Sequence, residues 1–437
     1  MRIALIHSHL NGRGGSQRYV IEIARELISQ KNVTVDIFAF DYNQESCYPE
    51  LTENLNICAV NVYGKTTLNS LKPNKTLFQR IQYKIKEIKL LKLLFLYFGV
   101  DYLISIYFSY KHSKCVSDLI LSSKNEYDIV FAHEEPISVW AAIWYKKKKQ
   151  IPIYWFCYDT IEKWYLDWSE AFSSSKLRRF LLLNLYFKLD KYLIVKFVDQ
   201  IAVLDNNMAE RVFRLYEISP IIRRGGVPIE LFKMVPDESL NTFYKIPKDK
   251  IVILSINRFA RYKRIHDIFL LYNALPTDVR ERLFFYINAP VSEADYYEEC
   301  KLNFGDVIDS NNFILDTNYP NSDHDMYNLY LLSDIFIFSS EKQTWGNAPL
   351  ESIALNNLAI VSSGCGISEI LYKISPNCVY NTGNIDQLKN IVINNIQNNC
   401  IKSASEIQKK YAFNNLNWSI ICESYLSDFR EIIMSKK

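Results

Sequence analysis

The stretch Gln343-Thr344-Trp345-Gly346-Asn347-Ala348-Pro349-Leu350-Glu351 indicates most clearly how this chain folds. It follows an apolar run at 335–338, which predicts a buried strand, and it leads into a predicted helix. Pro349 suits the first turn of a helix, because the N–H group that proline lacks would be unpaired there. A strand, a glycine-containing loop and a helix N-terminus form a natural seat for a phosphate or a sugar. Glu351, just inside the helix, is suited to accept hydrogen bonds from sugar hydroxyls.

Strand-like and helix-like segments alternate in the same way through both halves of the chain. This alternation predicts two doubly wound, Rossmann-like α/β domains, with ligands at the carboxyl ends of parallel strands. At 437 residues the chain is long enough for two domains of about 200 residues each. Proline-punctuated polar sequence at 228–250 marks the join, so we expect domains at 1–232 and 233–414. The predicted strands lie at 3–6, 33–40, 128–131, 153–156 and 200–204, and at 251–256, 283–287, 313–315, 334–338 and 358–361.

Composition and charge argue against several classes of protein. The residues are 49% hydrophobic and 23% charged, which is ordinary for a globular enzyme, and a net charge of +3 is too small to indicate nucleic acid binding. The nine cysteines are scattered, without a C-x-x-C pair or metal-ligand spacing. That pattern predicts reduced thiols in a cytoplasmic protein, and neither a disulfide framework nor a metal site. The apolar run at the N-terminus is too short for a signal peptide and predicts a first strand instead.

One basic segment departs from the alternation. Between Lys75 and Lys92, six basic residues face a single acidic one, and apolar residues recur at helical spacing. Two interpretations have similar weight: an amphipathic helix lying on an anionic membrane, or a core-facing helix whose lysines are merely solvated. A helix that spans the membrane is not expected, because about 20 uninterrupted apolar residues are needed. A second basic run, Lys146 to Lys149, favours the peripheral membrane interpretation.

Three further groups of residues each allow a functional and a structural interpretation. Gly14 and Gly15 follow the first strand and could admit a phosphate to a helix N-terminus, or simply form a tight turn. Arg258 and Lys263 follow the first strand of the second domain and could converge on a diphosphate, or be ordinary surface charges. His133 ends a predicted strand, where it could face a ligand or hold a neighbouring loop. His7 and His9 are weaker candidates of the same kind.

Taken together, these pieces resemble the GT-B glycosyltransferases of family four, which are retaining, metal-independent enzymes that use nucleotide sugars. The family's carboxylate–seven residues–glutamate pattern falls on Gln343 to Glu351, with Gln343 replacing the first glutamate. The resemblance covers almost the whole chain in the right order. Its other motifs fall on Gly14-Gly15 and Arg18, His133-Glu134-Glu135-Pro136, Gly226-Val227, Arg258 and Lys263, Gly366-Ile367-Ser368-Glu369, and Trp418 before a last helix at 415–437 that packs back on the first domain.

The resemblance implies roles for these residues, in two domains that face each other across a cleft. Glu351 would hold the ribose, Arg258 and Lys263 the diphosphate, and the amides of Gly346, Asn347 and Ala348 the sugar. Gly14, Gly15 and Gln343 would complete the donor site. In it, the Gly15 amide would touch the diphosphate. His133 would position the sugar or the acceptor, and no metal or other cofactor would be needed. The catalytic set implied is therefore His133, Glu351, Arg258 and Lys263.

The function that follows is transfer of a hexose from a UDP- or GDP-linked donor to an acceptor hydroxyl with retention, in lipid-linked glycan or surface polysaccharide assembly. Mannosyltransferases are a weak further resemblance. Two alternatives stay open. A non-catalytic binding or scaffold subunit is suggested by Gln343, which cannot bear the family's charge. A nucleotide-sugar epimerase would use the same fold, although no pair of carboxylates is assigned to acid and base roles.

Overall fold

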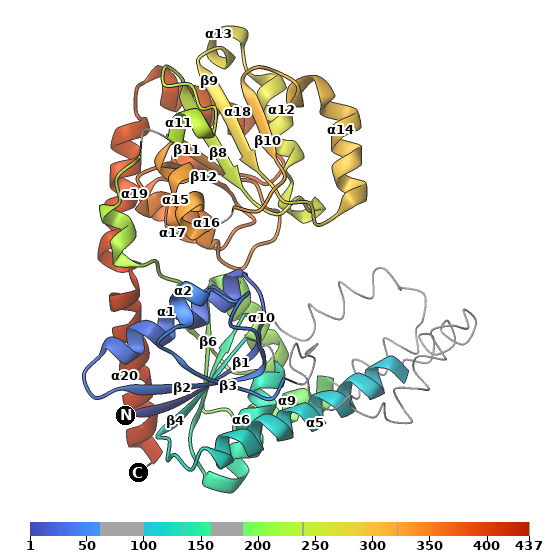
Figure 1. The fold of residues 1–437 in the computed structure, drawn as a ribbon, viewed down its shortest axis with the longest axis vertical. Coiled ribbons are helices and arrows are strands. Elements are labelled where there is room, and N and C mark those ends of the chain that lie inside the picture. Colours follow the sequence, from blue (N-terminus) through green and yellow to red (C-terminus); the bar gives the residue numbers. More distant parts are fainter. Residues whose placement is uncertain (62–99, 135, 159–186, 238–239, 321, 437) are drawn as a thin grey trace. The chain divides into compact units, whose positions relative to one another are not determined.

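The computed structural model describes residues 1–61, 100–134, 136–158, 187–237, 240–320 and 322–436. The chain forms two compact units (Figure 1). Unit 1 consists of Met1–Val203, Met208–Arg223 and Ser424–Lys437, and unit 2 consists of Leu204–Asn207 and Arg224–Glu423. The C-terminal part of the last helix therefore belongs to unit 1. The basic segment between Lys75 and Lys92 lies outside the described residues.

Unit 1 is built on a seven-stranded parallel sheet with the strand order β3-β2-β1-β4-β5-β6-β7. The order reverses its direction between β1 and β4, where Ile3 pairs with Val35 on one side and with Ile129 on the other. Such a switch point leaves room for a ligand beyond the carboxyl ends of the two strands. The strands are β1 (Arg2–Leu10), β2 (Thr34–Tyr42), β3 (Asn56–Ala59), β4 (Ile129–His133), β5 (Ile153–Cys157), β6 (Gln200–Val203) and β7 (Ile221–Ile222).

Helices cover both faces of the unit 1 sheet, as its strands require, because nearly every residue in β1, β4 and β5 is buried. One core packs even-numbered residues of β4, such as Val130, against α5, α6, α9 and α10. On the other face, Phe131 of β4 contacts Tyr425 and Phe429 of α20. The helices are α1 (Gly15–Ser29), α2 (Pro49–Thr52), α5 (Val100–Ser122), α6 (Pro136–Lys149), α9 (Phe187–Phe197), α10 (Asn206–Tyr216) and α20 (Trp418–Lys436).

Unit 2 repeats this plan with a six-stranded parallel sheet in the order β10-β9-β8-β11-β12-β13. Its switch point lies between β8 and β11, where Ile253 pairs with Ile335. The strands are β8 (Ile251–Ile256), β9 (Leu283–Asn288), β10 (Phe313–Asp316), β11 (Ile335–Phe338), β12 (Leu358–Ser362) and β13 (Val379–Tyr380).

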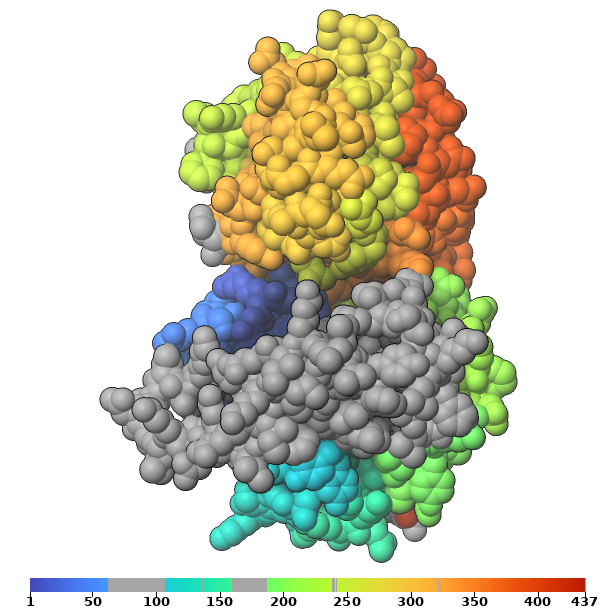
Figure 2. All heavy atoms as spheres, turned by 90° about the vertical axis from the view of Figure 1, so that its right-hand side faces the viewer, coloured from blue at the N-terminus to red at the C-terminus, as the bar shows by residue number. Residues whose placement is uncertain are grey.

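Helices flank the unit 2 sheet as well, and α14, on the right in Figure 1, forms part of the outer surface in Figure 2. A core of aliphatic and aromatic residues joins α12, α14 and α18 to the sheet. The helices are η2 (Ile229–Lys233), α11 (Leu240–Phe243), η3 (Arg261–Lys263), α12 (His266–Ala274), α13 (Thr277–Arg280), α14 (Ala294–Ile308), α15 (Asp323–Leu331), α16 (Asn347–Ala354), α17 (Ser368–Ile374), η4 (Pro376–Cys378), α18 (Ile385–Gln397) and α19 (Ile401–Asn415).

The prediction of two Rossmann-like α/β domains is confirmed, and each of the ten predicted strands is present. Three strands were not predicted: β3, β7 and β13, which are two to four residues long and lie at the ends of the strand orders. Within the described residues, none of the helices combines the length and the apolarity that crossing a bilayer demands.

Candidate functional site

The loop between β11 and α16 begins the candidate site of unit 2. Gly346 precedes α16 with φ of 129°, a conformation that L side chains rarely adopt, and a Cβ there would lie 2.9 Å from Pro349 Cγ. Glycine is therefore required for the chain to turn into the helix. Pro349 lies in the first helical turn, as the sequence predicts. The N–H groups of that turn have no acceptor within an α-helix, so this end favours anionic or hydroxyl-rich ligands.

A second loop, between β12 and α17, fixes the position of Gln343. The Gln343 N–H donates to the Gly364 carbonyl at 3.0 Å, and the Gly366 N–H donates to the Gln343 carbonyl at 2.8 Å. A Cβ on Gly366 would lie 2.2 Å from the Thr344 carbonyl oxygen, so only glycine permits this approach. The two loops thus support each other along their backbones, and the side chain of Gln343 leaves them from a fixed point.

The side chain of Gln343 meets Lys263. Lys263 belongs to η3, which follows β8, and it is only 7% exposed. Its Nζ donates a hydrogen bond to Gln343 Oε1 at 2.5 Å and lies 5.3 Å from the centre of the Phe338 ring. Because an amide is neutral, this hydrogen bond does not itself neutralise the charge of the lysine. A cation in such surroundings attracts an anion more strongly than one in water.

Arg258 is linked to Lys263 through Tyr262. Arg258 follows β8, is exposed, and donates from Nη2 to the Tyr262 hydroxyl at 2.8 Å. The Lys263 ammonium lies 5.0 Å from the centre of the Tyr262 ring. The two predicted cations therefore belong to one connected group at the carboxyl end of β8.

Glu351 lies one turn inside α16 and is 6% exposed. The hydroxyl of Tyr330, on α15, donates to its Oε2 at 3.4 Å, which is long for an O–H···O bond. A carboxylate at this place is suited to accept hydrogen bonds from ligand hydroxyls.

Glu369 ends the motif Gly366-Ile367-Ser368-Glu369, and its side chain links two other segments of unit 2. Its carboxylate accepts hydrogen bonds from the Asn206 N–H at 2.8 Å and from Arg224 Nη2 at 2.6 Å. The guanidinium of Arg224 in turn lies 5.4 Å from the centre of the buried Trp345 ring. Sequence reasoning gave no role to Arg224 or Trp345, because their contact depends on tertiary packing beside the Gly346 loop.

The glycine loop of unit 1 leads from β1 into α1. Gly14 precedes the first helical residue, Gly15, in an extended conformation that any residue can adopt. A Cβ on Gly14 would meet chiefly the amide end of Gln17, which is able to move. Arg18 is buried and lies 3.8 Å from Glu22 Oε1, so a carboxylate balances its charge. The structure therefore shows a well-formed helix start. Both arginines of this region have an acidic neighbour, since Arg13 pairs with Glu50 as Arg18 does with Glu22.

His133 lies fully buried at the end of β4. Its ring stacks on Phe156 of β5 at 5.1 Å and on His7 of β1 at 5.3 Å, and Tyr19 of α1 packs beside it. Three rings on three neighbouring strands thus form a continuous layer. Neither ring nitrogen of His133 has a hydrogen-bond partner among the described residues. Burial, and then the neighbouring His7, hold the pKa of His133 well below its ordinary value, so the ring is neutral near pH 7.

The next residue, Glu134, was quoted in the sequence but given no role. Its carboxylate accepts hydrogen bonds from Ser8 Oγ at 2.5 Å and from Ser16 Oγ at 2.7 Å, and His7 Nε2 lies 3.2 Å away. Burial lowers the pKa of His7, although Glu134 opposes this shift. Glu134 lies within the motif His133-Glu134-Glu135-Pro136, but no sequence pattern predicted these contacts, because they come from β1 and α1, more than 100 residues away.

The predicted site residues therefore fall into two groups. Each group lies at the carboxyl ends of the strands of its own unit, and none of the described His, Cys, Asp and Glu side chains gather in threes that could hold a metal ion. Unit 1 contributes Gly14, Gly15 and His133, and unit 2 contributes Arg258, Lys263, Gln343, Gly346, Asn347, Ala348 and Glu351.

Comparison with protein families gives two matches along the chain. A model described as Glycosyltransferase Family 4 matches residues 13–225, and a model described as Glycosyl transferases group 1 matches residues 237–414. No curated protein matches the sequence.

Several solved structures share the fold of the whole chain. The Anabaena HepE protein in complex with UDP and glucose is 12% identical, with a TM-score of 0.67, and the match covers 99% of this chain and 100% of that one. A glycosyltransferase from Rickettsia africae is 16% identical, with a TM-score of 0.66 and coverage of 99% and 98%. Sucrose-phosphate synthase from Thermosynechococcus elongatus is 13% identical, with a TM-score of 0.66 and 99% coverage of both chains. At these identities the likeness concerns the fold.

Proposed function

Because this chain belongs to the glycosyltransferases of the GT-B fold, with a likeness to family four, we propose that it transfers a hexose from a nucleoside diphosphate donor to an acceptor hydroxyl with retention of configuration. The observation that carries this proposal is the group around Lys263 and Gln343, next to the N-terminus of α16 and Glu351. That arrangement offers cations for a diphosphate, backbone amides for a sugar and a carboxylate for ribose hydroxyls. The UDP held by the Anabaena neighbour supports a nucleotide-sugar donor.

In the proposed reaction, the bond between the anomeric carbon and the diphosphate oxygen breaks, and the acceptor oxygen bonds to the same face of that carbon. The proton of the acceptor hydroxyl passes to the departing diphosphate. Lys263 and Arg258 stabilise the negative charge that develops on the diphosphate, which is the kind of interaction that contributes most to such catalysis. The proposal assigns no role to a metal or another cofactor, and His133 and the Gly14–Gly15 loop would help to hold the substrates.

The experiment is incubation of the protein with a panel of radiolabelled UDP- and GDP-linked sugars and a lipid extract. Transfer of label to lipid or glycan, lost in Glu351→Ala, is expected and would also place the enzyme in lipid-linked glycan or surface polysaccharide assembly. The substitution of Gln343 for the family's glutamate favours one alternative, a non-catalytic binding subunit. Binding of nucleotide without turnover would support that alternative, and conversion of the donor sugar itself would support an epimerase.

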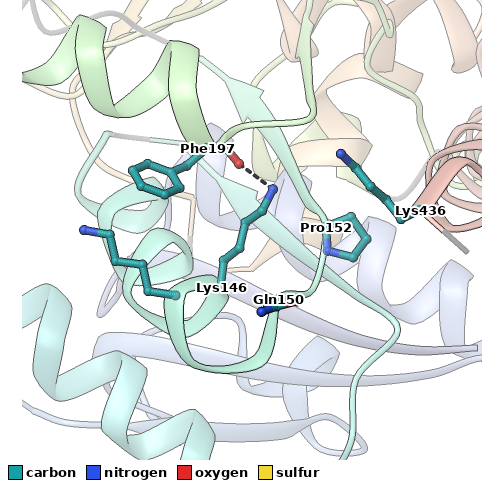
Figure 3. A pocket seen from close by; sticks show the side chains of 6 residues that line it. Lys146, Gln150, Pro152, Phe197 and Lys436 are labelled. Carbon is teal, nitrogen blue, oxygen red and sulfur yellow. Dashed lines mark hydrogen bonds between the residues drawn. The ribbon is translucent and has the colours of Figure 1, made fainter.

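We further propose that unit 1 binds an anionic membrane at its periphery, where a lipid-linked acceptor would be reached. Support comes from the surface where α6 and α9 end (Figure 3), with a cavity of about 310 Å³ lined by Lys146, Lys147, Gln150, Pro152, Phe197 and Lys436. The Lys147 ammonium lies 4.6 Å from the Trp144 ring and 5.0 Å from the Phe197 ring, and the side chain of Tyr192 is 55% exposed. Aromatic rings with lysines beside them are typical of the membrane–water interface.

The charge of this surface is smaller than the sequence suggests. Lys146 bonds to Asp199 at 2.5 Å and to the Phe197 carbonyl at 2.8 Å, and Lys148 pairs with Asp118 at 2.9 Å. Lys147 and Lys149 are therefore the members of the run expected to contribute most, at about 1 kcal/mol each near an anionic surface.

Liposome co-sedimentation tests the membrane proposal. Replacing Lys147, Lys149 and Lys196 with Ser should reduce sedimentation with acidic vesicles at low salt, and salt should weaken the wild-type binding steeply. The matched control replaces three exposed lysines of unit 2 with Ser: Lys373, Lys402 and Lys410. Equal sedimentation of all three proteins, or none with acidic lipid at low salt, would remove this surface as a membrane contact.

A further inference from the structure

Glu134 has an unusual backbone conformation for a glutamate. Its φ is 79°, in the left-handed region, which costs a residue with a Cβ on the order of 1 kcal/mol. Its N–H donates to the Phe156 carbonyl at 2.9 Å, and its own carbonyl accepts from Trp155 Nε1 at 3.0 Å. Both contacts come from β5, so the fold holds Glu134 in this conformation, and the side chain reaches β1 and α1 on the other side.

The carboxylate of Glu134 is held by donors from two elements. Ser8 of β1 and Ser16 of α1 bond to different oxygens, and His7 Nε2 lies 3.2 Å from Oε2. His7 Nδ1 accepts from the His9 N–H at 3.2 Å, and His7 Nε2, although close to Glu134, makes no hydrogen bond among the described residues. A carboxylate has about four acceptor positions, so the two serine hydroxyls leave capacity for a ligand. Its side chain is 16% exposed.

Glu134 differs from another buried carboxylate of unit 1, Asp36, in the charges that surround it. Asp36 accepts hydrogen bonds from Asn56, Tyr127 and Asn125 and also from the guanidinium of Arg2, at 3.3 Å. A cation thus balances its charge. Among the described residues, no lysine or arginine lies within ion-pair distance of Glu134, whose one basic neighbour there is His7. The charge of Glu134 is therefore fixed in place by neutral donors and is left for a further hydrogen-bond donor.

We propose that Glu134 is an acceptor-binding residue, whose carboxylate accepts hydrogen bonds from the hydroxyls of a neutral sugar. The proposal rests on the proposed function, since it names the chemical class of the acceptor. A carboxylate strengthens a hydrogen bond from a hydroxyl but repels a phosphate. The acceptor group beside Glu134 is therefore a glycosyl unit and not a phosphate. Glu134 orients a hydroxyl and takes no proton in this proposal.

One consequence concerns the place of the reaction in a sequence of reactions. An acceptor that presents neutral sugar hydroxyls already carries at least one sugar. Where that sugar is attached to a carrier, a separate transferase must have attached it earlier, and this chain extends the product of that reaction.

The test measures binding of simple probes to the full chain by saturation-transfer NMR and titration. The probes are the methyl glycosides of glucose, galactose and mannose, with glucose 1-phosphate as the anionic comparison. We expect at least one neutral glycoside to bind, and we expect binding of glucose 1-phosphate, which the cations of unit 2 can hold, to be unaffected by Glu134→Gln. Glu134→Gln should raise the Kd for that glycoside roughly 5- to 15-fold, because a charge-assisted hydrogen bond becomes an ordinary one. The serine hydroxyls can turn to accept from the glutamine amide, so the variant should fold.

The matched control is Glu217→Gln. Glu217 is also a left-handed glutamate of unit 1, with φ of 58°, and its exposed carboxylate bonds to Lys191. Its replacement should leave glycoside binding unchanged. If Glu134→Gln fails to fold, Ser16→Ala keeps the charge, removes one anchor and should weaken glycoside binding severalfold.

The proposal is overturned by absence of glycoside binding, by an equal loss of glucose 1-phosphate binding in Glu134→Gln, or by unchanged glycoside binding in Glu134→Gln or, where that variant does not fold, in Ser16→Ala. Titration of UDP and GDP into the same samples tests the proposed function separately. Failure of both nucleotides to bind, with glycoside binding intact, would count against nucleotide-sugar transfer and not against the acceptor role of Glu134.

Discussion

The two units present groups of opposite charge at equivalent places in the same kind of fold. At the switch point of unit 2, Lys263 and Arg258 follow the first strand, and a helix N-terminus lies nearby. At the switch point of unit 1, the groups that follow the strands are the neutral His133 and the carboxylate of Glu134. A doubly wound sheet therefore sets where a ligand binds, and the side chains at the strand ends decide its chemistry. Phosphates suit unit 2, and hydroxyls suit unit 1.

A second difference concerns how the polar groups are held. In unit 2, Lys263 donates to the neutral amide of Gln343, and Glu351 accepts a long hydrogen bond from Tyr330. In unit 1, Glu134 is bound by two serine hydroxyls, and His133 lies inside a layer of aromatic rings. Substitutions at His133 and Glu134 should consequently affect packing as well as ligand binding.

The largest effect should come from Glu351→Ala. Loss of charge-assisted bonds to two ribose hydroxyls should lower kcat/KM by about 100-fold or more, equivalent to about 3 kcal/mol of transition-state stabilisation. Thermal unfolding should change little, since the role proposed for Glu351 is with the ligand and not in the core. Tyr330→Phe is the control and should retain most activity. If Glu351→Ala unfolds while its folded fraction stays active, Glu351 is a structural residue and the contrast between the units fails.

A smaller effect is expected from Lys263→Ala. A desolvated charge-assisted contact is worth roughly 1.5–3 kcal/mol, so the Kd for UDP or GDP should rise about 10- to 150-fold. Arg258→Ala should raise it only severalfold, because Arg258 is exposed and water screens its charge. Calorimetric titration of both variants measures this difference. Unchanged affinity in both would remove the diphosphate from this part of unit 2.

Much of the fold could be predicted because hydrophobic runs report burial directly. The strands at the centres of the two sheets are buried on both faces and therefore read as continuous apolar runs. The edge strands β3, β7 and β13 were missed, because two to four residues carry too little pattern and depend on a neighbouring strand for pairing. The start of α16 was predictable, since Gly346 and Pro349 act locally.

The side-chain environment of the site was much less predictable. His133 was predicted to lie at the end of a strand. Its surroundings were not predictable, because His7, Phe156 and Tyr19, which enclose it, come from three other elements. The same is true of the contact between Lys263 and Gln343, which are 80 residues apart in the sequence. Sequence patterns record local periodicity, whereas these contacts depend on how strands far apart in the chain align.

A moderate effect should come from His133→Phe. The new ring preserves the stack on His7 and Phe156 and removes two buried nitrogens that have no partner among the described residues, so stability should rise by about 1 kcal/mol. Activity should fall about tenfold if a ring nitrogen holds a substrate, in the range for a hydrogen bond lost in the transition state. Thermal melting and transfer assays measure the two quantities. Full activity in a stabilised variant would make His133 a packing residue.

The smallest effect should come from Gln343→Glu, which restores the residue that family four carries at this position. The carboxylate would accept the same hydrogen bond from Lys263, so the loop and the fold should be retained. An ion pair in place of an ion–amide contact would stabilise the protein by at most about 1 kcal/mol, because Gln343 is only half-buried. Turnover should equal or exceed that of the wild type, and Gln343→Met, which cannot accept this bond well, is the matched control with reduced donor affinity. A large loss of turnover in Gln343→Glu would mean that a carboxylate beside Lys263 weakens the attraction of the lysine for the diphosphate. The site of unit 2 would then depend on a neutral amide at this position.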